Sequence, residues 1–333
     1  MASSLLRSAS MRRLLLLLSV AACGTEYAPA TDPQPDAGTA PGDAAYVDLV
    51  PPTEGFQIRT PDITIPGGKE MTYCYYFHTP NQAETIVKSW QSRMTPGSHH
   101  MILYFTGTAD MPDGTLDPTG SCGTTGNVAN LPVWTYLAQA PEAEAAMPAD
   151  DGAGMPVGMA IPPGQAAVMQ MHYLNSGDPP ITVHVTLNAN GYAPNTAYTP
   201  AAAFVTYNTK IDIPAGVGMT ATAQGACTVS PTQKFFTMST HAHKQAVETR
   251  VRDGATTLVD STDWEHPLVK TWSAAPFYSF TSGKLGYQCD YVNGGTAEIK
   301  TGPSAQTNEM CMAIGYNFPA TKSTMCINST VLP

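Results

Sequence analysis

Charged residues are scarce in this 333-residue chain, at 13% of the sequence, and 26 Asp and Glu outnumber 16 Lys and Arg. Phosphate binding needs Lys and Arg to displace counterions, so this acidic balance argues against a nucleic-acid partner. The apolar run Leu14 to Leu18 is much shorter than the ~20 residues that a membrane-spanning helix requires. Little charge together with 28 Gly and 29 Pro favours an exported all-β protein over a helical one.

No two cysteines are spaced as a Cys-x-x-Cys pair, so the chain gives no support to a zinc knuckle or a thioredoxin-like redox motif. Six cysteines follow Cys23, and an even number in an exported chain indicates disulfides, whose connectivity this count leaves open. They divide two and four around residue 200, which indicates two separately stapled units. These six are Cys74, Cys122, Cys227, Cys289, Cys311 and Cys326.

The first residues have the order of an export signal. Arg7, Arg12 and Arg13 precede the apolar run, and small residues then lead into Cys23. This order resembles the lipobox of bacterial lipoproteins, in which the Cys is lipidated and becomes the mature N-terminus; an ordinary signal peptide with a chance Cys is the alternative. We expect residues 1–22 to be a signal peptide, and a lipid on Cys23 to hold the protein on a membrane, at its periplasmic face or at the cell surface. Signal removal leaves 13 basic and 26 acidic side chains, a formal charge of −13.

The rest of the chain divides into a tether and a large body. Residues 23–45 are rich in Ala, Pro, Thr, Asp and Gly with almost no large apolar side chain, so we expect a flexible linker. The body exceeds one typical domain. Its expected boundary is the turn-forming segment at residues 190–195, which predicts domains at residues 46–192 and 193–333.

Short alternating apolar runs, bounded by Gly, Pro, Asn or Asp, predict β-strands throughout the body. Residues 85–93 and 131–139 alone suggest helices, and both are brief. Many short strands predict an all-β protein made of two tandem antiparallel, jelly-roll-like β-sandwiches. The predicted strands are Phe56 to Ile63, His100 to Phe105, Ala167 to Tyr173, Thr182 to Leu187, Phe204 to Ile211, Phe235 to His241, Ala246 to Val251 and Ala313 to Phe318.

Five of the eight histidines gather in three short clusters, and Met310 follows them along the chain. Imidazoles together with a thioether suit copper better than other metals. His241 and His243 lie two residues apart at a predicted strand, so they present both rings to one side. The alternative is a solvated pair on an exposed strand. The clusters therefore predict a metal centre.

The first two clusters need a special backbone to contribute. Adjacent His99 and His100 would point to opposite faces of a regular strand. The turn-forming residues 96–98 before them predict a bulge or strand end, at which both rings can face one metal. His172 lies in a strand-like run, where a lone His is more often structural. We assign the remaining three histidines to packing or to the surface: His78, His184 and His266.

The blocks around these residues resemble one family. They occur in the order and approximate spacing of the copper type II, ascorbate-dependent monooxygenases, the group of peptidylglycine α-hydroxylating monooxygenase and dopamine β-monooxygenase. The resemblance covers roughly residues 55 to 330 and includes the cysteine pattern. It implies an oxidoreductase that hydroxylates a C–H bond of a small molecule with O2 and two electrons from an external reductant such as ascorbate. The blocks are Ser98 to Phe105, Gln170 to Tyr173, Thr240 to His243 and Glu309 to Cys311.

The resemblance implies two separate coppers per chain, on two sandwiches that face a shared cleft. The electron-supplying copper would take its ligands from the first sandwich: His99, His100 and His172. The oxygen-binding copper would take them from the second: His241, His243 and Met310. A soft sulfur ligand favours Cu(I) and would contribute little to zinc, whereas the ordinary role of a Met is core filling.

Supporting residues follow from the same resemblance. Gln170 occupies a family position near the first copper and would orient one of its ligands. A disulfide from Cys289 to Cys311 would fix the backbone beside Met310. The implied disulfides are Cys289–Cys311, Cys227–Cys326 and, with these, Cys74–Cys122.

Three positions depart from the peptide-amidating members. Ser239 stands where those enzymes carry an Arg that clamps the substrate carboxylate, and a hydroxyl cannot replace a guanidinium there. Met312 and Ile314 stand where an Asn and a Tyr are expected after the copper-binding Met, which makes that wall apolar. These departures argue against glycine-extended peptides and favour a less polar substrate.

Two other functions use the same ligands. A non-catalytic periplasmic protein would hold copper for storage, delivery or sensing, and a closed cleft without a substrate pocket would favour it. A zinc hydrolase would use three His and a bound water. Such an enzyme pairs its metal with a general base, and no Glu or Asp adjoins the clustered histidines in the sequence.

Overall fold

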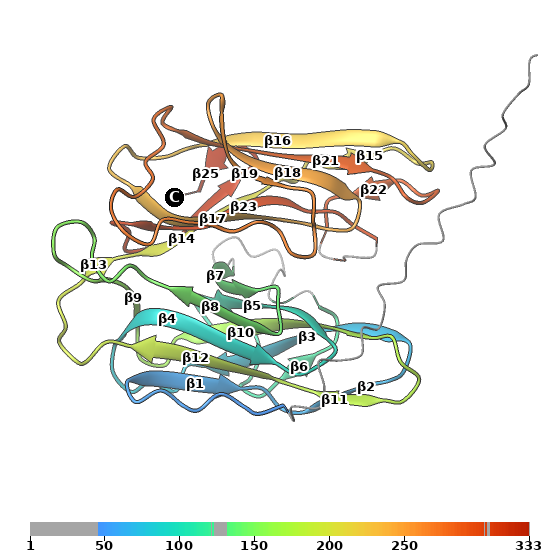
Figure 1. The fold of residues 1–333 in the computed structure, drawn as a ribbon. Coiled ribbons are helices and arrows are strands. Elements are labelled where there is room, and N and C mark those ends of the chain that lie inside the picture. Colours follow the sequence, from blue (N-terminus) through green and yellow to red (C-terminus); the bar gives the residue numbers. More distant parts are fainter. Residues whose placement is uncertain (1–45, 121, 123–131, 303, 305–306, 333) are drawn as a thin grey trace, which may run out of the picture. The chain divides into compact units, whose positions relative to one another are not determined.

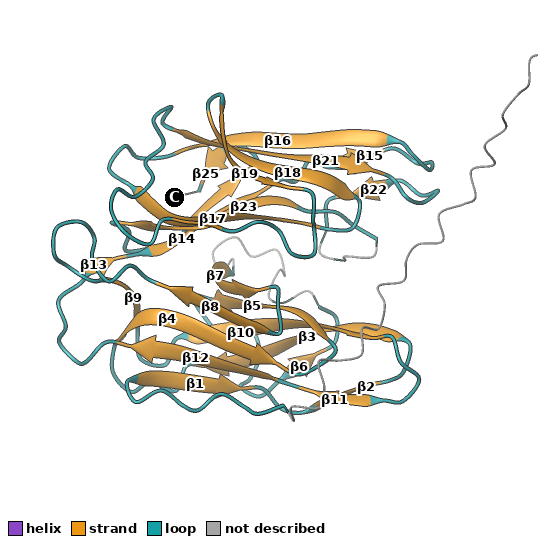
Figure 2. Cartoon of the chain, in the orientation of Figure 1, coloured by secondary structure: helices purple, strands orange, loops and turns teal. Residues whose placement is uncertain are grey.

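The computed structural model describes residues 46–120, 122, 132–302, 304 and 307–332, which belong to one compact unit, Tyr46–Pro333. The predicted signal peptide, the tether and the lipidation residue Cys23 lie outside the described residues. The described part contains strands, turns and loops but no helix (Figure 2), which confirms the all-β prediction. No described segment is therefore a helix long and apolar enough to cross a membrane.

Two sheets make up the first half of the unit (Figure 1). Their strands are β1 Gly55–Arg59, β3 Lys69–His78, β4 Thr85–Met94, β5 Ser98–Phe105, β6 Leu116–Asp117, β7 Val133–Ala138, β8 Glu142–Ala146, β9 Val157–Ile161, β10 Ala166–Asn175, β12 Val185–Gly191 and β13 Thr199–Pro200. The β4 sheet has the order β1-β12-β4-β9-β13, with β8 also paired to β4. The β10 sheet has the order β6-β3-β10-β5-β7, and a separate short ladder joins β2 Ile63–Ile65 to β11 Ile181–Val183.

The second half contains two further sheets. Their strands are β14 Ala202–Tyr207, β16 Thr220–Thr228, β17 Lys234–Ala242, β18 Ala246–Asp253, β19 Thr256–Ser261, β20 Lys270–Thr271, β21 Lys284–Val292, β23 Cys311–Phe318, β24 Thr324–Ile327 and β25 Thr330–Val331. The β17 sheet has the order β20-β17-β23-β14-β24-β25, and the β21 sheet has the order β16-β21-β18-β19. A short ladder pairs β15 Asp212–Ile213 with β22 Ile299–Lys300.

Side chains that alternate between the two faces of each strand determine how the sheets are layered. On β10, Met169, Met171 and Tyr173 are fully buried in the core shared with the β4 sheet, so His172 projects from the opposite face. The same hydrophobic cluster includes Ile314 of the β17 sheet, while a second core fills the space between the β17 and β21 sheets. The β10 and β17 sheets therefore pack on each other.

The change from first-half to second-half sheets falls later than the predicted boundary. Thr199 and Pro200 pair in parallel with Val157 and Gly158 of β9, so this segment extends the β4 sheet. The first strand of the β17 sheet, β14, begins only at Ala202. The segment at residues 190–195 is therefore not where the chain changes sheets.

The two suggested helices are strands. Residues 85–93 belong to β4, and Val133–Ala138 within the second segment form β7. Thr85 and Val87 in β4 and Thr135 in β7 are β-branched, and such side chains pack well on a pleated surface. Pairing with neighbouring strands therefore outweighs the weak helical pattern. Three long strands were not predicted, β3, β16 and β21, although alternate residues of β21 are strictly buried.

Candidate metal centre

A bulge in β5 brings His99 and His100 toward the same side. His100 lies opposite His172 of β10, but the next pair along the ladder is Ser98 with Tyr173, which makes His99 the extra residue. A bulge bends the strand and re-aims a side chain that regular pleating would send to the other face. The irregularity that the turn-forming residues predict is therefore present.

The imidazoles of His99, His100 and His172 converge. One ring nitrogen from each lies within 4.8 Å of those of the other two. Nδ1 of His99 and Nδ1 of His100 are 3.1 Å apart, a separation that corresponds to roughly 100° at a metal ion about 2.0–2.1 Å from both. Such an angle suits a tetrahedral or three-coordinate ion. The geometry of this donor set therefore fits a bound metal.

Side chains from both halves contact this triad from outside. Oε1 of Glu70 lies 2.6 Å from Nε2 of His172, which leaves Nδ1 of that ring free to face a metal. Oε1 of Glu265 lies 3.5 Å from Nε2 of His99, and the indole of Trp264 lies 5.8 Å from the same ring between centroids. A carboxylate behind a ligating His orients the ring and raises its basicity.

Sequence reasoning missed these contacts because the partners are far apart along the chain. Glu70 is 102 residues from His172 and lies on β3, a strand that was not predicted. Gln170, the residue predicted to orient a ligand, donates its amide to the carbonyl of Gly120 at 3.1 Å. It thereby supports the loop before Cys122. Its role toward the first copper stays a prediction.

His241 and His243 lie at the end of β17 and both use Nδ1 for hydrogen bonds. Nδ1 of His243 donates to the carbonyl of Asn308 at 3.0 Å, and Nδ1 of His241 lies 3.1 Å from Oε1 of Gln139. A carbonyl oxygen only accepts, so each Nδ1 carries the proton and each Nε2 is left as the ligand atom. The two ring centroids are 5.4 Å apart.

One buried carboxylate ties His243 to Met310. The residue is Glu309, which is 0% exposed. Its Oε2 accepts from the backbone N–H of His243 at 2.9 Å and of Met310 at 3.3 Å, while Oε1 accepts from Gln245 N–H at 2.7 Å. The carbonyl of Met310 in turn accepts from Tyr291 Oη at 2.8 Å. These bonds hold the Met310 backbone beside His243; its thioether as a ligand stays a prediction.

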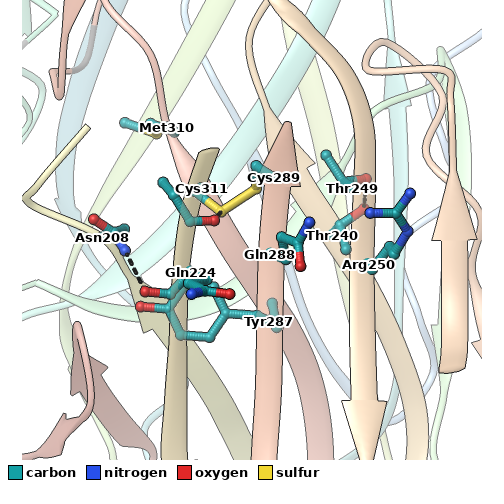
Figure 3. The surroundings of a disulfide bond; sticks show 12 residues. Asn208, Gln224, Thr240, Thr249, Arg250, Tyr287, Gln288, Cys289, Met310 and Cys311 are labelled. Carbon is teal, nitrogen blue, oxygen red and sulfur yellow. Dashed lines mark hydrogen bonds between the residues drawn. A yellow bond between two sulfur atoms is a disulfide. The ribbon is translucent and has the colours of Figure 1, made fainter. Parts of the chain in front are cut away.

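Three disulfides have the pairing that the resemblance implies, Cys74–Cys122, Cys227–Cys326 and Cys289–Cys311. The bond between Cys289 and Cys311 joins β21 to the first residue of β23, next to Met310 (Figure 3). Together with the Glu309 hydrogen bonds, it restrains the backbone of Met310 from both sides.

The two imidazole sets meet between the β10 and β17 sheets. The rings of His100 and His241 are in edge-on contact with centroids 6.1 Å apart. The resemblance predicts two sets across a shared cleft, whereas the facing sheets here bring the five imidazoles into one continuous cluster. The indole of Trp134 lies 6.0 Å from the ring of His241, and its buried N–H has no hydrogen-bond partner among the described residues.

Burial keeps four of these imidazoles neutral at neutral pH, those of His100, His172, His241 and His243. It lowers the pKa of His241 to about 3 and the pKa values of His172 and His243 to about 4. It also lowers the pKa of His100 well below the ordinary value, and neighbouring rings add to the effect because two protonated imidazoles repel each other. A metal binds the neutral ring, so these ligands are held in their binding form. Burial also raises the pKa of Glu309 to about 7.

The other three histidines lie outside the cluster. His184 is buried, in agreement with a packing role, and its Nε2 lies 2.8 Å from Oδ1 of Asp48. His78 and His266 are exposed and pair with nearby aspartates. The cluster therefore contains the five histidines that the sequence pattern selected.

No protein-family model matches the chain, and no curated protein matches it. Among solved structures, the major capsid protein P2 of bacteriophage PM2 aligns over 78% of this chain and 97% of its own, with 7% identity and a TM-score of 0.29. The tail fiber protein gp63.1 of an E. coli phage aligns over 79% of this chain and 38% of its own, with 6% identity and a TM-score of 0.18. Scores this low support no conclusion about fold or function.

Proposed function

We propose that this protein is a copper-dependent monooxygenase that hydroxylates a C–H bond of a small molecule. The balanced reaction converts R–H, O2, two electrons and two protons into R–OH and water, with the electrons from an external reductant such as ascorbate. The observation that carries the proposal is the cluster of five imidazoles, four of them buried and neutral, with Met310 held beside it by Glu309.

Each ligand set would hold one copper, three imidazoles in the first and two imidazoles with Met310 in the second. Bound copper would supply one-electron redox chemistry and activation of O2. The chain's own residues orient the ligands. Glu70 leaves Nδ1 of His172 free, while Gln139 and the carbonyl of Asn308 leave Nε2 of His241 and His243 free. The packed β10 and β17 sheets limit the access of water to this cluster.

One observation favours a zinc hydrolase as the second candidate. No carboxylate adjoins the histidines in the sequence, but Glu70 and Glu265 lie against the first triad in the fold. Three imidazoles with a carboxylate nearby also suit a catalytic zinc and its bound water. Glu70, however, bonds the ring of His172, which supports a role in orienting that ligand rather than in activating water.

A storage role is less well supported by the structure. A cavity of about 620 Å³ adjoins His241 through Gln139, which lines the cavity and hydrogen-bonds that ring. This volume lies within the usual range for small-molecule sites. A protein that only stores or delivers copper has no need of such a pocket beside its ligands.

Metal analysis of protein purified without an affinity tag tests the proposal first. We expect two coppers per chain, with one lost in His99→Ala and one in His241→Ala. His78→Ala is the matched control, because His78 is exposed and pairs with Asp113, and it should retain both. One zinc and no copper per chain would refute copper in favour of the hydrolase. Loss of both metals from either single variant would contradict two independent sites.

Oxygen chemistry is the second test. Oxygen uptake by the copper-loaded protein with ascorbate should depend on substrate, and label from ¹⁸O2 should appear in the product. Met310→Ile should abolish this uptake and leave the fold largely intact, because the two side chains have similar volumes and only the thioether is lost. Uptake at the parent rate would exclude Met310 as a ligand. Bound copper without substrate-dependent uptake across aromatic, aliphatic and peptide compounds would favour storage.

Export and anchoring form a separate part of the proposal. The three disulfides support an oxidising compartment, where such bonds persist. We propose that the protein is a lipoprotein anchored through Cys23. Labelling with a radioactive fatty acid should mark the parent protein but not Cys23→Ser; equal labelling of both would refute the anchor.

A further inference from the structure

A cavity of about 620 Å³ lies between the β7–β8 segment of the first half and strands β17 and β23 of the second. We propose that it binds a neutral, largely apolar small molecule, aromatic or aliphatic, and that molecules with a carboxylate are excluded. This substrate class rests on the proposed hydroxylation at the neighbouring imidazoles. The binding itself is a property of the metal-free chain and is testable without copper.

Strand register makes the cavity wall continuous with the ligand face. Ser239 on β17 pairs with Ile314 on β23, and the next pair on the same face is His241 with Met312. Residues two apart on a strand share a face and lie about 7 Å apart. Ser239 and Ile314 line the cavity. A molecule lying along this wall therefore has one end at Gln139, whose side chain hydrogen-bonds the ring of His241.

The first half closes the cavity at the same end. Gln139 follows β7 and lines the cavity, and its Oε1 lies 3.1 Å from Nδ1 of His241. The loop that carries Trp264 and Glu265 against His99 continues into Pro267 and Val269, which line the cavity as well. One loop and one side chain thus connect the cavity to both imidazole sets.

The chemistry of the walls selects the occupant. Most of the lining is apolar, and none of the described residues that form it is Lys or Arg. Its carboxylate and imidazole members are Glu144 and His266, both exposed. The hydroxyl of Ser239 already donates to the carbonyl of Leu268 at 3.1 Å. A buried carboxylate would therefore lose its hydration without gaining a cationic partner, and Glu144 would repel it. Apolar lining residues include Leu137, Ala143, Met147, Phe236, Val269 and Ile314.

A matched pair of ligands tests the proposal on the metal-free full-length chain. 4-Phenylbutan-1-ol and 4-phenylbutyrate share a carbon frame and differ in charge. Isothermal titration calorimetry should show the alcohol binding at least about tenfold more tightly than the carboxylate. The δ1-methyl NMR signal of Ile314 should shift on addition of the alcohol. Equal or tighter binding of the carboxylate, or no shift at Ile314, would overturn the proposal.

Two substitutions at the same position, one that adds a cation and one that does not, refine the test. Ser239→Arg places a cation in the cavity and should raise the affinity for 4-phenylbutyrate about tenfold or more, while Ser239→Ala should leave the preference for the alcohol unchanged. If Ser239→Arg does not change the preference for the alcohol over 4-phenylbutyrate, the ligands do not bind in this cavity. The δ1-methyl NMR signal of Ile314 in the ligand-free Ser239→Arg protein shows whether this variant retains its fold.

The outcomes separate this inference from the proposed function. Binding of the alcohol to metal-free protein, with no hydroxylation after copper loading, would support the pocket and refute the monooxygenase. Hydroxylation that is confined to carboxylate substrates would support the monooxygenase and refute the substrate class.

Discussion

Replacing Glu309 by Gln should both destabilise the protein and weaken its second metal site. The parent carboxylate is fully buried and accepts three backbone N–H bonds, from His243, Gln245 and Met310. A Gln side chain keeps one oxygen and places an NH2 group where the other stood. At least one buried N–H then faces a donor instead of an acceptor.

The expected loss follows from these bonds. Leaving one buried N–H unsatisfied costs about 1–3 kcal/mol, and the remaining bonds lose the assistance of a charged acceptor. Gln also removes the desolvation cost of the buried charge, the effect that raises the pKa of Glu309 to about 7, and this offsets part of the loss. We therefore expect a net decrease of about 1–2 kcal/mol in the free energy of unfolding of the metal-free protein. Equilibrium urea unfolding with the disulfides intact measures it, at pH 8, which is above the pKa of about 7 that burial gives Glu309.

Copper binding provides a second readout of the same variant. His243 and Met310 lose a common anchor, so the second copper should bind at least about tenfold more weakly while the first is retained. Glu298→Gln is the control, because Glu298 is exposed and pairs with Lys300 at 3.1 Å. If Glu309→Gln unfolds at the parent urea concentration and binds both coppers as tightly as the control, the assigned role of Glu309 is wrong.

Three further predictions test other parts of the structure. Glu70→Gln should lower the affinity of the first site for Cu(I) about 10–100-fold in a competition assay, because it weakens the hydrogen bond to His172, and should leave the affinity of the second site unchanged. An equal loss of affinity at both sites would contradict this role of Glu70. Burial raises the pKa of Asp253, but hydrogen bonds from Ser282 and Thr281 outweigh this effect and hold that pKa well below its usual range. The stability that the ionised Asp253 gives to the fold is therefore complete above about pH 4 and declines as the pH falls further. Urea unfolding at pH 7 and pH 3 should therefore show a smaller acid loss for Asp253→Asn than for the parent. Tyr316→Phe removes the 2.5 Å bond to the carbonyl of Thr135 and should lower the free energy of unfolding by about 1–2 kcal/mol; no change in urea midpoint would refute it.

Local sequence was sufficient to predict the fold class and part of the centre. Alternating residues predicted β17 and β18, because the two faces of a strand meet different surroundings. The short apolar run at residues 313–318 predicted β23, which is buried on both faces. The spacing of His241 and His243 placed both rings on one side for the same reason. Turn-forming residues before His99 predicted an irregularity, and a bulge is found there. Each of these features depends on neighbours within a few residues.

Tertiary structure alone decided how the centre is assembled. Residues 85–93 became β4 because strand pairing outweighed their local pattern. Glu70 reached His172 only because β3 pairs with β10, and Gln139 reached His241 only because two sheets pack face to face. Contacts across such separations depend on which strands pair and which faces are buried together. The sequence therefore determined the ligand types and their local geometry, while sheet packing decided that the two imidazole sets meet.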